Sequence, residues 1–160
     1  MTSDRDLEQQ EPAVRPDNPS DIPAIRPASL DRLEALVGQW KMEAPFDART
    51  TFEWLEGKFF LLQRFVADHP AAPSGIAIIA ANEGRETFSQ HYYDSCGVAR
   101  VYQMSLDGGV WRVWREEPGF WQQYTRVISD DGTRITGSWE GSVDGREWTH
   151  DFDLNYIKVA

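Results

Sequence analysis

The chain has 160 residues and a formal net charge of −10. The length suits one domain, and the charge argues against nucleic acid or an anionic membrane as a partner, because both would repel the protein. Seven Trp, eight Phe and five Tyr require a core that can bury them. No apolar run approaches the ~20 residues of a membrane-spanning helix.

Cys96 is the only cysteine, so no intramolecular disulfide is possible, and a reducing compartment is the simplest inference. The first residues, Met1 to Arg5, lead into charged sequence without an apolar stretch, so we expect no secretory signal. Both observations favour a cytoplasmic location.

Residues 1–27 contain five prolines among acidic and amide residues and no aromatic residue. Such a segment cannot bury enough apolar surface to offset the entropy of ordering it. We therefore expect a disordered proline-rich tail over residues 1–27 and one folded domain over residues 28–160.

A short amphipathic helix is predicted at the start of this domain. Leu30, Leu33 and Leu36 recur at helical spacing, Ser29 is a candidate N-cap and Gly38 a candidate C-cap residue. Its apolar stripe needs a cover, and an open barrel end would provide one.

From Gln39 onward, turn signals such as Asp107-Gly108-Gly109 and Asp130-Asp131-Gly132 recur between about ten short segments rich in β-branched and aromatic residues. No interval could hold a crossover helix, so the strands should be antiparallel neighbours. We predict an all-β fold, a closed antiparallel up-and-down barrel of about ten strands, because closure removes exposed sheet edges.

The final strand alternates clearly. Its apolar and aromatic residues share one face with a histidine: Trp148, His150, Phe152, Leu154 and Tyr156. Side chains two residues apart face the same side of a strand, so we expect His150 to point into the barrel.

Several runs resemble an uncharacterised bacterial family of lipocalin-like (calycin-type) barrels, a domain of unknown function. They are Phe52 to Arg64, Gln90 to Ser95 with Gly97 to Tyr102, and the ending His150 to Tyr156. The resemblance extends from about residue 29 to the end and implies the barrel fold without implying an activity.

Gly38-Gln39-Trp40 is also distantly similar to the Gly-x-Trp signature of the nitrobindins, ten-stranded haem-holding barrels that resemble fatty-acid-binding proteins. Met42 and Ala44 stand where that signature continues with glycines. The resemblance implies haem as an alternative ligand and His150 as the counterpart of a C-terminal iron-ligating histidine.

Two arginines lie in strands that would line the barrel. Arg64 follows an apolar run, and Arg100 shares its strand with Tyr102. An inward arginine could hold a carboxylate or phosphate through two parallel hydrogen bonds. Alternatively, such an arginine forms a structural ion pair with Glu53 or Asp94.

The turn at Cys96 and Gly97 decides which residues face Arg100 and Tyr102. A two-residue turn would place His91 and Tyr93 on their face, forming a polar group able to move a proton. A three-residue turn with a bulge at Gly97 would place Gln90 and Tyr92 there instead. The sequence leaves both registers open.

Aromatic residues are the expected walls of a ligand pocket. Trp111 and Trp114 have opposite parity in one strand, so only one can face inward. With Arg64, Arg100 and Tyr102, the expected ligand-binding residues are Trp54, Trp114, Tyr124, Trp139 and Trp148. The alternative is that these side chains fill the barrel and leave no cavity.

We therefore expect a protein that binds a small apolar or aromatic ligand, with or without a negative charge, inside the barrel. The first alternative is a cofactor-free isomerase or cyclase with His91, Tyr93 and His150 as catalytic residues. The second is a haem-binding protein, and the third is a filled barrel whose tail recognises a partner.

Neither a cofactor nor a metal is expected. The three histidines, His69, His91 and His150, lie on separate segments and no carboxylate joins them at metal-ligand spacing. The expected partner is a small molecule rather than nucleic acid or a membrane, and the oligomeric state stays open, with a homodimer among the options.

Overall fold

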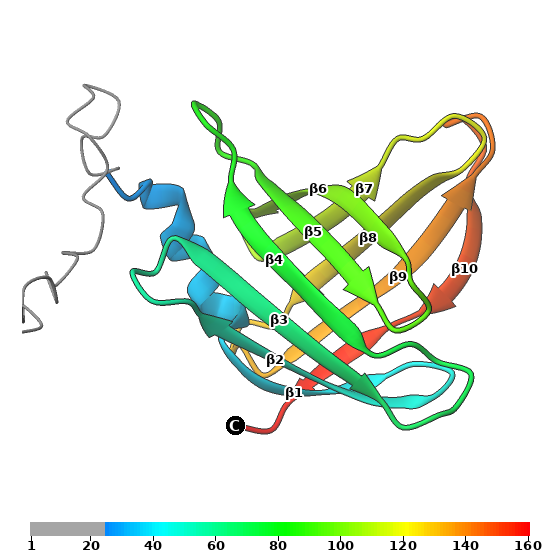
Figure 1. The fold of residues 1–160 in the computed structure, drawn as a ribbon, viewed down its shortest axis with the longest axis horizontal. Coiled ribbons are helices and arrows are strands. Elements are labelled where there is room, and N and C mark those ends of the chain that lie inside the picture. Colours follow the sequence, from blue (N-terminus) through cyan, green and yellow to red (C-terminus); the bar gives the residue numbers. More distant parts are fainter. Residues whose placement is uncertain (1–24) are drawn as a thin grey trace, which may run out of the picture.

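The computed structural model describes residues 25–160, which form a β-barrel with one short helix (Figure 1). The elements are the 3-10 helix η2 (Ala28–Leu36) and the strands β1 (Gly38–Glu43), β2 (Asp47–Trp54), β3 (Phe60–Ala67), β4 (Gly75–Ala81), β5 (Phe88–Asp94), β6 (Ala99–Asp107), β7 (Val110–Arg115), β8 (Trp121–Ile128), β9 (Arg134–Ser142), β10 (Thr149–Asp153) and β11 (Asn155–Lys158).

Each strand from β1 to β9 pairs antiparallel with the next, as the short turns between them require. β11 lies between β9 and β1 and closes the ring, so ten strands form the barrel and β10 is an additional strand beside β9. The predicted closed up-and-down barrel is confirmed.

The end of the chain differs from the single alternating strand that the sequence suggested. β10 and β11 are separate pieces that pair with successive halves of β9. The register shifts between His150 and Phe152, so that His150 lies opposite Glu140 and Phe152 opposite Trp139. Such a bulge reverses the facing of every residue before it.

η2 covers one end of the barrel. Leu30, Leu33 and Leu36 are buried, and their three-residue spacing matches the three residues per turn of a 3-10 helix. The predicted cap is wrong, because Pro27 occupies the N-cap position and no side chain caps the helix. Gly38 already begins β1, and Val37 ends the helix.

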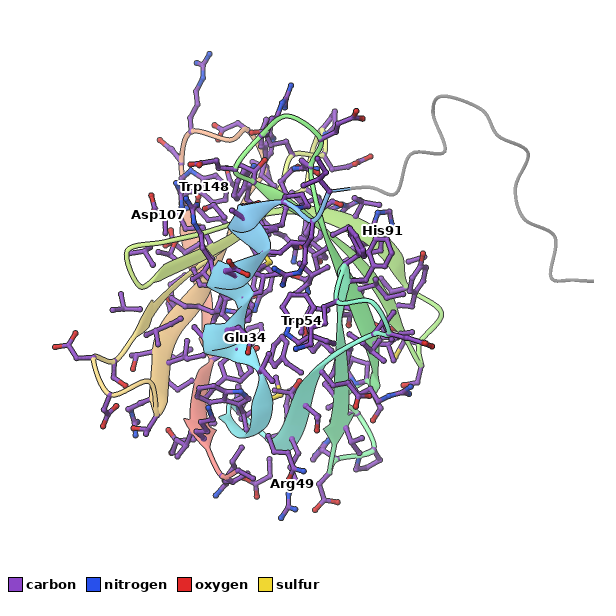
Figure 2. The ribbon with its side chains drawn as sticks, turned by 90° about the vertical axis from the view of Figure 1, so that its left-hand side faces the viewer. Glu34, Arg49, Trp54, His91, Asp107 and Trp148 are labelled. Atoms are coloured by element: carbon purple, nitrogen blue, oxygen red, sulfur yellow. The ribbon has the colours of Figure 1, made fainter. Side chains whose placement is uncertain are left out.

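A hydrogen bond ties the helix to the barrel rim. The Trp54 Nε1 donates to Glu34 Oε1 at 2.7 Å, and Figure 2 shows the two side chains beside each other at this end. The Trp40 Nε1 donates to the Leu36 carbonyl at 2.8 Å. These contacts fix the helix as the closed floor of the barrel.

The tail predicted for residues 1–27 falls mainly on residues 1–24, outside the described residues. Arg26, in its last part, donates from Nε to the Lys58 carbonyl at 2.8 Å and lies over the Trp54 ring. Within residues 25–160, no helix is both long and apolar enough to cross a membrane.

Candidate ligand-binding cavity

A cavity of about 360 Å³ lies inside the barrel, within the range of roughly 300 to 1,000 Å³ typical of small-molecule sites. Phe46 and Pro73, from the connections after β1 and β3, belong to its wall at the end opposite η2 (Figure 1). Other lining residues come from nearly every strand of the barrel, among them Met42, Ala48, Gln63, Phe65, Gln90, Tyr92, Arg100, Tyr102, Gln122, Arg126, Trp139 and Tyr156. The barrel is therefore hollow.

The inner face of β8 runs from the mouth of this cavity to its floor. Gln122, Tyr124 and Arg126 alternate with outward residues and so share that face. Gln122 lies near the connection after β7, whereas Arg126 lies four residues deeper, ~13 Å along the strand at ~3.3 Å per residue. β8 therefore carries one polar group at the mouth and one at the floor.

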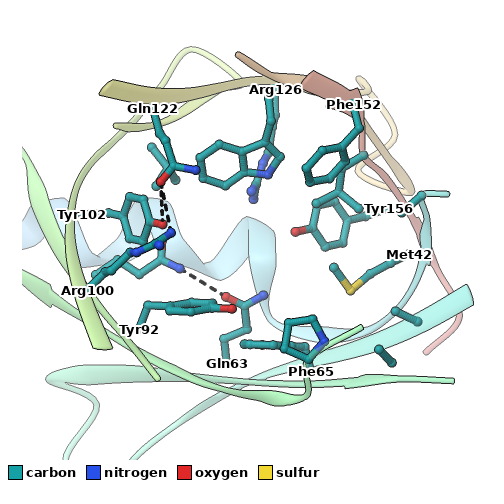
Figure 3. A pocket seen from close by; sticks show the side chains of 18 of the residues that line it. Met42, Gln63, Phe65, Tyr92, Arg100, Tyr102, Gln122, Arg126, Phe152 and Tyr156 are labelled. Atoms are coloured by element: carbon teal, nitrogen blue, oxygen red, sulfur yellow. Dashed lines mark hydrogen bonds between the residues drawn. The ribbon is translucent and has the colours of Figure 1, made fainter. Parts of the chain in front are cut away.

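Arg126 is packed among aromatic rings at the floor. Its side chain is buried, and the residue is 4% exposed. The guanidinium carbon lies 3.6 Å from the ring centre of Trp111, its partner in the β7–β8 ladder, and 3.4 Å from that of Tyr124. Tyr156 contributes a third ring at 5.0 Å. Figure 3 shows Arg126 pointing into the cavity towards Tyr156.

This guanidinium has no anionic partner within the part of the chain that the structure describes. Among the described residues no carboxylate forms an ion pair with it, and its buried Nε and Nη1 make no hydrogen bond. Burial lowers its pKa from the ordinary value, but arginine keeps its proton in proteins. A buried unpaired charge costs several kcal/mol, whereas each ring contributes about 0.5 to 2 kcal/mol.

The neighbouring phenols do not neutralise this charge. Burial raises the pKa of both Tyr124 and Tyr156, although the positive charge of Arg126 acts in the opposite direction. Both phenols are therefore protonated at neutral pH, and the Tyr124 hydroxyl is already used as a donor to the Leu154 carbonyl. The floor of the cavity carries a net positive charge.

A second polar group lies at the mouth. Gln122 Oε1 accepts hydrogen bonds from the Tyr102 hydroxyl at 3.1 Å and from Arg100 Nη1 at 3.4 Å (Figure 3). The Arg100 guanidinium also lies 5.5 Å from the ring centre of Phe120. Arg100 thus differs from Arg126, because it is only half buried and has a polar partner.

The opposite wall carries a row of buried polar side chains. Gln63 Nε2 donates to Thr50 Oγ1 at 3.1 Å, and Gln90 Nε2 reaches Gln63 Oε1 at 3.5 Å. Gln90 Oε1 is buried and accepts no hydrogen bond from any described residue. This row offers a ligand an additional hydrogen-bonding site beside the apolar walls.

Aromatic rings form much of the remaining wall. Tyr92 stacks on Phe65 with 5.5 Å between ring centres and meets Tyr102 edge to face at 6.1 Å. Tyr102 in turn contacts Trp139 at 5.9 Å. A chain of rings therefore links β3, β5, β6 and β9 around the cavity, a surface suited to apolar or planar molecules.

Four of the eight expected ligand-binding residues lie at the cavity. Arg100, Tyr102 and Trp139 line the cavity, and Tyr124 lies buried beside Arg126. Each of these four side chains lies on the inner face of its strand, as expected when inward and outward residues alternate.

Arg64 does not belong to the cavity. It lies on the outer face of β3, its side chain is 62% exposed, and its Nε lies 3.8 Å from Glu53 Oε1. The inward neighbours on β3 are instead Gln63 and Phe65. Arg64 therefore forms the ion pair with Glu53 that was the alternative expectation. The expected role of Arg64 as a ligand anchor is wrong.

The turn after β5 has the three-residue form. Asp94 pairs with Val98 around Ser95 to Gly97, and Gly97 has a φ of 81°. This register places Gln90 opposite Tyr102 and Tyr92 opposite Arg100. His91 and Tyr93 therefore face outward, and the catalytic group predicted from the other register is not assembled.

His150 also faces outward. Its Nε2 lies 2.8 Å from the exposed carboxylate of Asp153, and the bulge before Phe152 explains why its parity differs from the prediction. His69 lies in the exposed β3–β4 connection, so none of the three histidines lines the cavity. The residues present do not fit a haem held through His150.

Three of the expected tryptophans lie away from the cavity. Trp114 has outward parity on β7, and Trp111 is the buried member of the pair. Trp148 lies with Trp114 at an outer surface depression. Trp54 points inward at the closed end but contacts η2 rather than the cavity. Their predicted ligand-lining role is wrong.

Arg126 is the most informative residue that the sequence analysis missed. The signal was present, because Tyr124 was expected to face inward and Arg126 lies two residues further along the same strand. Gln122 lies two residues before Tyr124, so the same alternation predicts that it faces inward. Gln90 and Tyr92 belonged to the register that the sequence left open.

Comparison with known proteins does not assign this chain to a family. No protein-family model matches this sequence, and the search of curated proteins finds no match. Within residues 25–160, no cluster of three or more His, Cys, Asp or Glu side chains is arranged to hold a metal ion. The fold and cavity define a hollow β-barrel.

Proposed function

We propose that this protein binds a small, predominantly apolar or aromatic molecule inside its barrel. The observation that carries the proposal is the cavity of about 360 Å³ whose walls join aromatic rings to a few polar groups. Sites of this composition gain affinity from buried apolar surface and orientation from the polar groups.

The residues expected to catalyse proton transfer in the enzyme alternative do not lie in the cavity. His91, Tyr93 and His150 lie on the outer face of the barrel, so none of them can reach a molecule in the cavity. Binding, rather than proton transfer by these residues, is the function that the interior supports.

A cavity-filling variant tests the proposal. Ala48 lines the cavity from β2 and is buried, so Ala48→Phe would place a ring in the ligand space. Ala99 is exposed on the outer face of β6, and Ala99→Phe is the matched control. The neutral fluorescent probe N-phenyl-1-naphthylamine reports binding without requiring charge on the ligand.

The wild-type protein and Ala99→Phe should bind the probe saturably, and Ala48→Phe should lose that binding while keeping its circular dichroism spectrum. Equal probe binding by all three proteins would place the probe outside the cavity. That outcome, or no probe binding by the wild type, would count against the proposal.

A further inference from the structure

We infer that the ligand carries a single negative charge, of the carboxylate type, and that Arg126 at the floor of the cavity binds it. This inference rests on the proposed function and specifies the chemical class of the ligand. It rests on the position of Arg126, on its unused donors and on the placement of the other charged groups.

Arg126 faces the cavity with donors that no described residue uses. Nε and Nη1 are buried and have no hydrogen-bond partner within residues 25–160, and the side chain belongs to the cavity wall. A guanidinium presents its N–H groups as a planar fork that matches the two oxygens of a carboxylate. The ligand group that matches this fork is therefore an anion with at least two acceptor oxygens.

The surroundings hold the fork in place. Trp111 and Tyr124 lie against the guanidinium, and neutral aromatic rings stabilise a cation without occupying its N–H groups. Gly137, opposite Arg126 in the β8–β9 ladder, leaves room for the side chain, because a Cβ there would lie 2.9 Å from Arg126 Cγ. The donors are thus positioned before any ligand enters.

The charge inventory favours one negative charge on the ligand. Among the described residues, Arg126 and Arg100 are the cationic side chains in the cavity wall, and Arg100 at the mouth already donates to Gln122. One buried guanidinium neutralises a carboxylate, whereas a phosphate monoester would leave excess charge at the floor.

The arrangement also fixes the direction of the ligand. Its acidic group lies innermost at Arg126, and its apolar body extends past Phe65 towards the mouth near Gln122; Figure 3 shows these three side chains. Trp139 also belongs to the wall beside the apolar body. The protein as a whole is strongly negative, with a formal charge of −10. An anion gains nothing from long-range attraction, so its selectivity must come from the buried contact.

A pair of probes with the same body tests the inference. Decanoate carries the carboxylate, and decanamide replaces it with a neutral group of similar size. Titration calorimetry at neutral pH and low chloride compares their affinities for the wild type and for Arg126→Met, with Arg64→Met as the control on the outer face. Methionine replaces the stem of the arginine side chain by an apolar one and removes the guanidinium charge.

The wild type and Arg64→Met should prefer decanoate over decanamide by roughly tenfold or more, and Arg126→Met should lose this preference while still binding decanamide. Equal affinity of the wild type for both probes would overturn the anion inference and leave the proposed function standing. An unchanged preference in Arg126→Met would also overturn it. Failure of both probes to bind, together with failure of the neutral fluorescent probe, would overturn the proposed function itself.

Discussion

Arg126 and Trp111 face each other across the β7–β8 ladder, with the guanidinium carbon 3.6 Å from the centre of the indole ring. The ring supplies a favourable electrostatic surface for the cation but no hydrogen-bond acceptor. The Trp111 Nε1 is itself buried and has no hydrogen-bond partner among residues 25–160. This pair places a charged, incompletely satisfied group at the floor of an otherwise aromatic cavity.

Arg126→Met should stabilise the ligand-free protein. Replacing a buried, unpaired charge by an apolar side chain removes a desolvation cost of several kcal/mol and loses ring contacts of about 0.5 to 2 kcal/mol each, so we expect a net gain of about 1 kcal/mol or more. Urea unfolding measures the effect. Arg64→Met, which removes an exposed ion pair with Glu53, should change the free energy of unfolding by less than about 1 kcal/mol.

A loss of more than about 1 kcal/mol in Arg126→Met would show that the aromatic contacts exceed the cost of burying the charge. That result would contradict the view that Arg126 is retained for a ligand at the expense of stability.

Gly137→Ala should destabilise the protein, because the new Cβ would lie 2.9 Å from Arg126 Cγ and closer still to the backbone oxygen of Thr125. Overpacking of this kind costs about 1 to 3 kcal/mol. Gly141→Ala is the control on the same face of β9, since its Cβ would lie 3.8 Å from the nearest atom, the Trp121 oxygen. Thermal unfolding of both variants checks the prediction, and equal melting temperatures would refute it.

His91→Ala and His150→Ala should change ligand affinity by less than about twofold, or about 0.4 kcal/mol. Both side chains lie on the outer face, and His150 Nε2 lies 2.8 Å from the exposed Asp153 carboxylate. The fluorescent probe and decanoate both serve for the measurement. A tenfold loss of ligand affinity in either variant would show that the substituted histidine contributes to the binding site and would favour the enzyme alternative.

Acid should weaken the turn between β8 and β9. Hydrogen bonds from the hydroxyls of Ser129 and Thr133 and from the Thr133 backbone lower the pKa of Asp131 to about 2. A lowered folded-state pKa contributes stability above the unfolded value, ~3.9, and that contribution is lost as the pH falls towards 2.

The stability difference between the wild type and Asp131→Asn should therefore shrink between about pH 4 and pH 2. Asp130→Asn is the control, because Asp130 belongs to the same turn and makes none of these hydrogen bonds. Urea unfolding across this pH range provides the measurement. A constant difference would mean that Asp131 does not titrate with folding.

Alkali should leave three of the five tyrosines protonated until the barrel unfolds. Burial raises the pKa of Tyr92, Tyr124 and Tyr156 above the ordinary value, ~10. Because the folded-state pKa is raised, the stability is complete below the unfolded pKa and declines as the pH rises above it. Phenolate absorbance from these three side chains should therefore appear only together with unfolding, and complete ionisation of the tyrosines while the circular dichroism spectrum is still that of the folded barrel would contradict the prediction.

The sequence predicted the barrel because turn signals and strand-length segments recur regularly, and a meander of antiparallel strands closes naturally. It could not predict the facing of Arg64. The outer face of β3 also carries Phe60 and Val66, so hydrophobicity does not distinguish the two sides of this strand. A sequence shows which residues of a strand face inward only when one face of the strand is clearly polar.

Two local irregularities of the backbone explain why the predictions for His91 and His150 are wrong. The bulge between His150 and Phe152 moves His150 outward, and the three-residue turn at Gly97 moves His91 outward. Each shifts a strand by one residue, and a one-residue shift exchanges the two faces. In regular β8, by contrast, simple alternation from Tyr124 reaches Arg126 correctly.

Native mass spectrometry of the purified protein, with the bound material extracted and identified, tests most directly whether the barrel holds a small molecule. We predict that the wild type retains or takes up a small organic acid in one-to-one stoichiometry and that Ala48→Phe does not. A folded wild type that carries no such molecule, and binds neither decanoate nor the neutral fluorescent probe when they are added, would contradict the account.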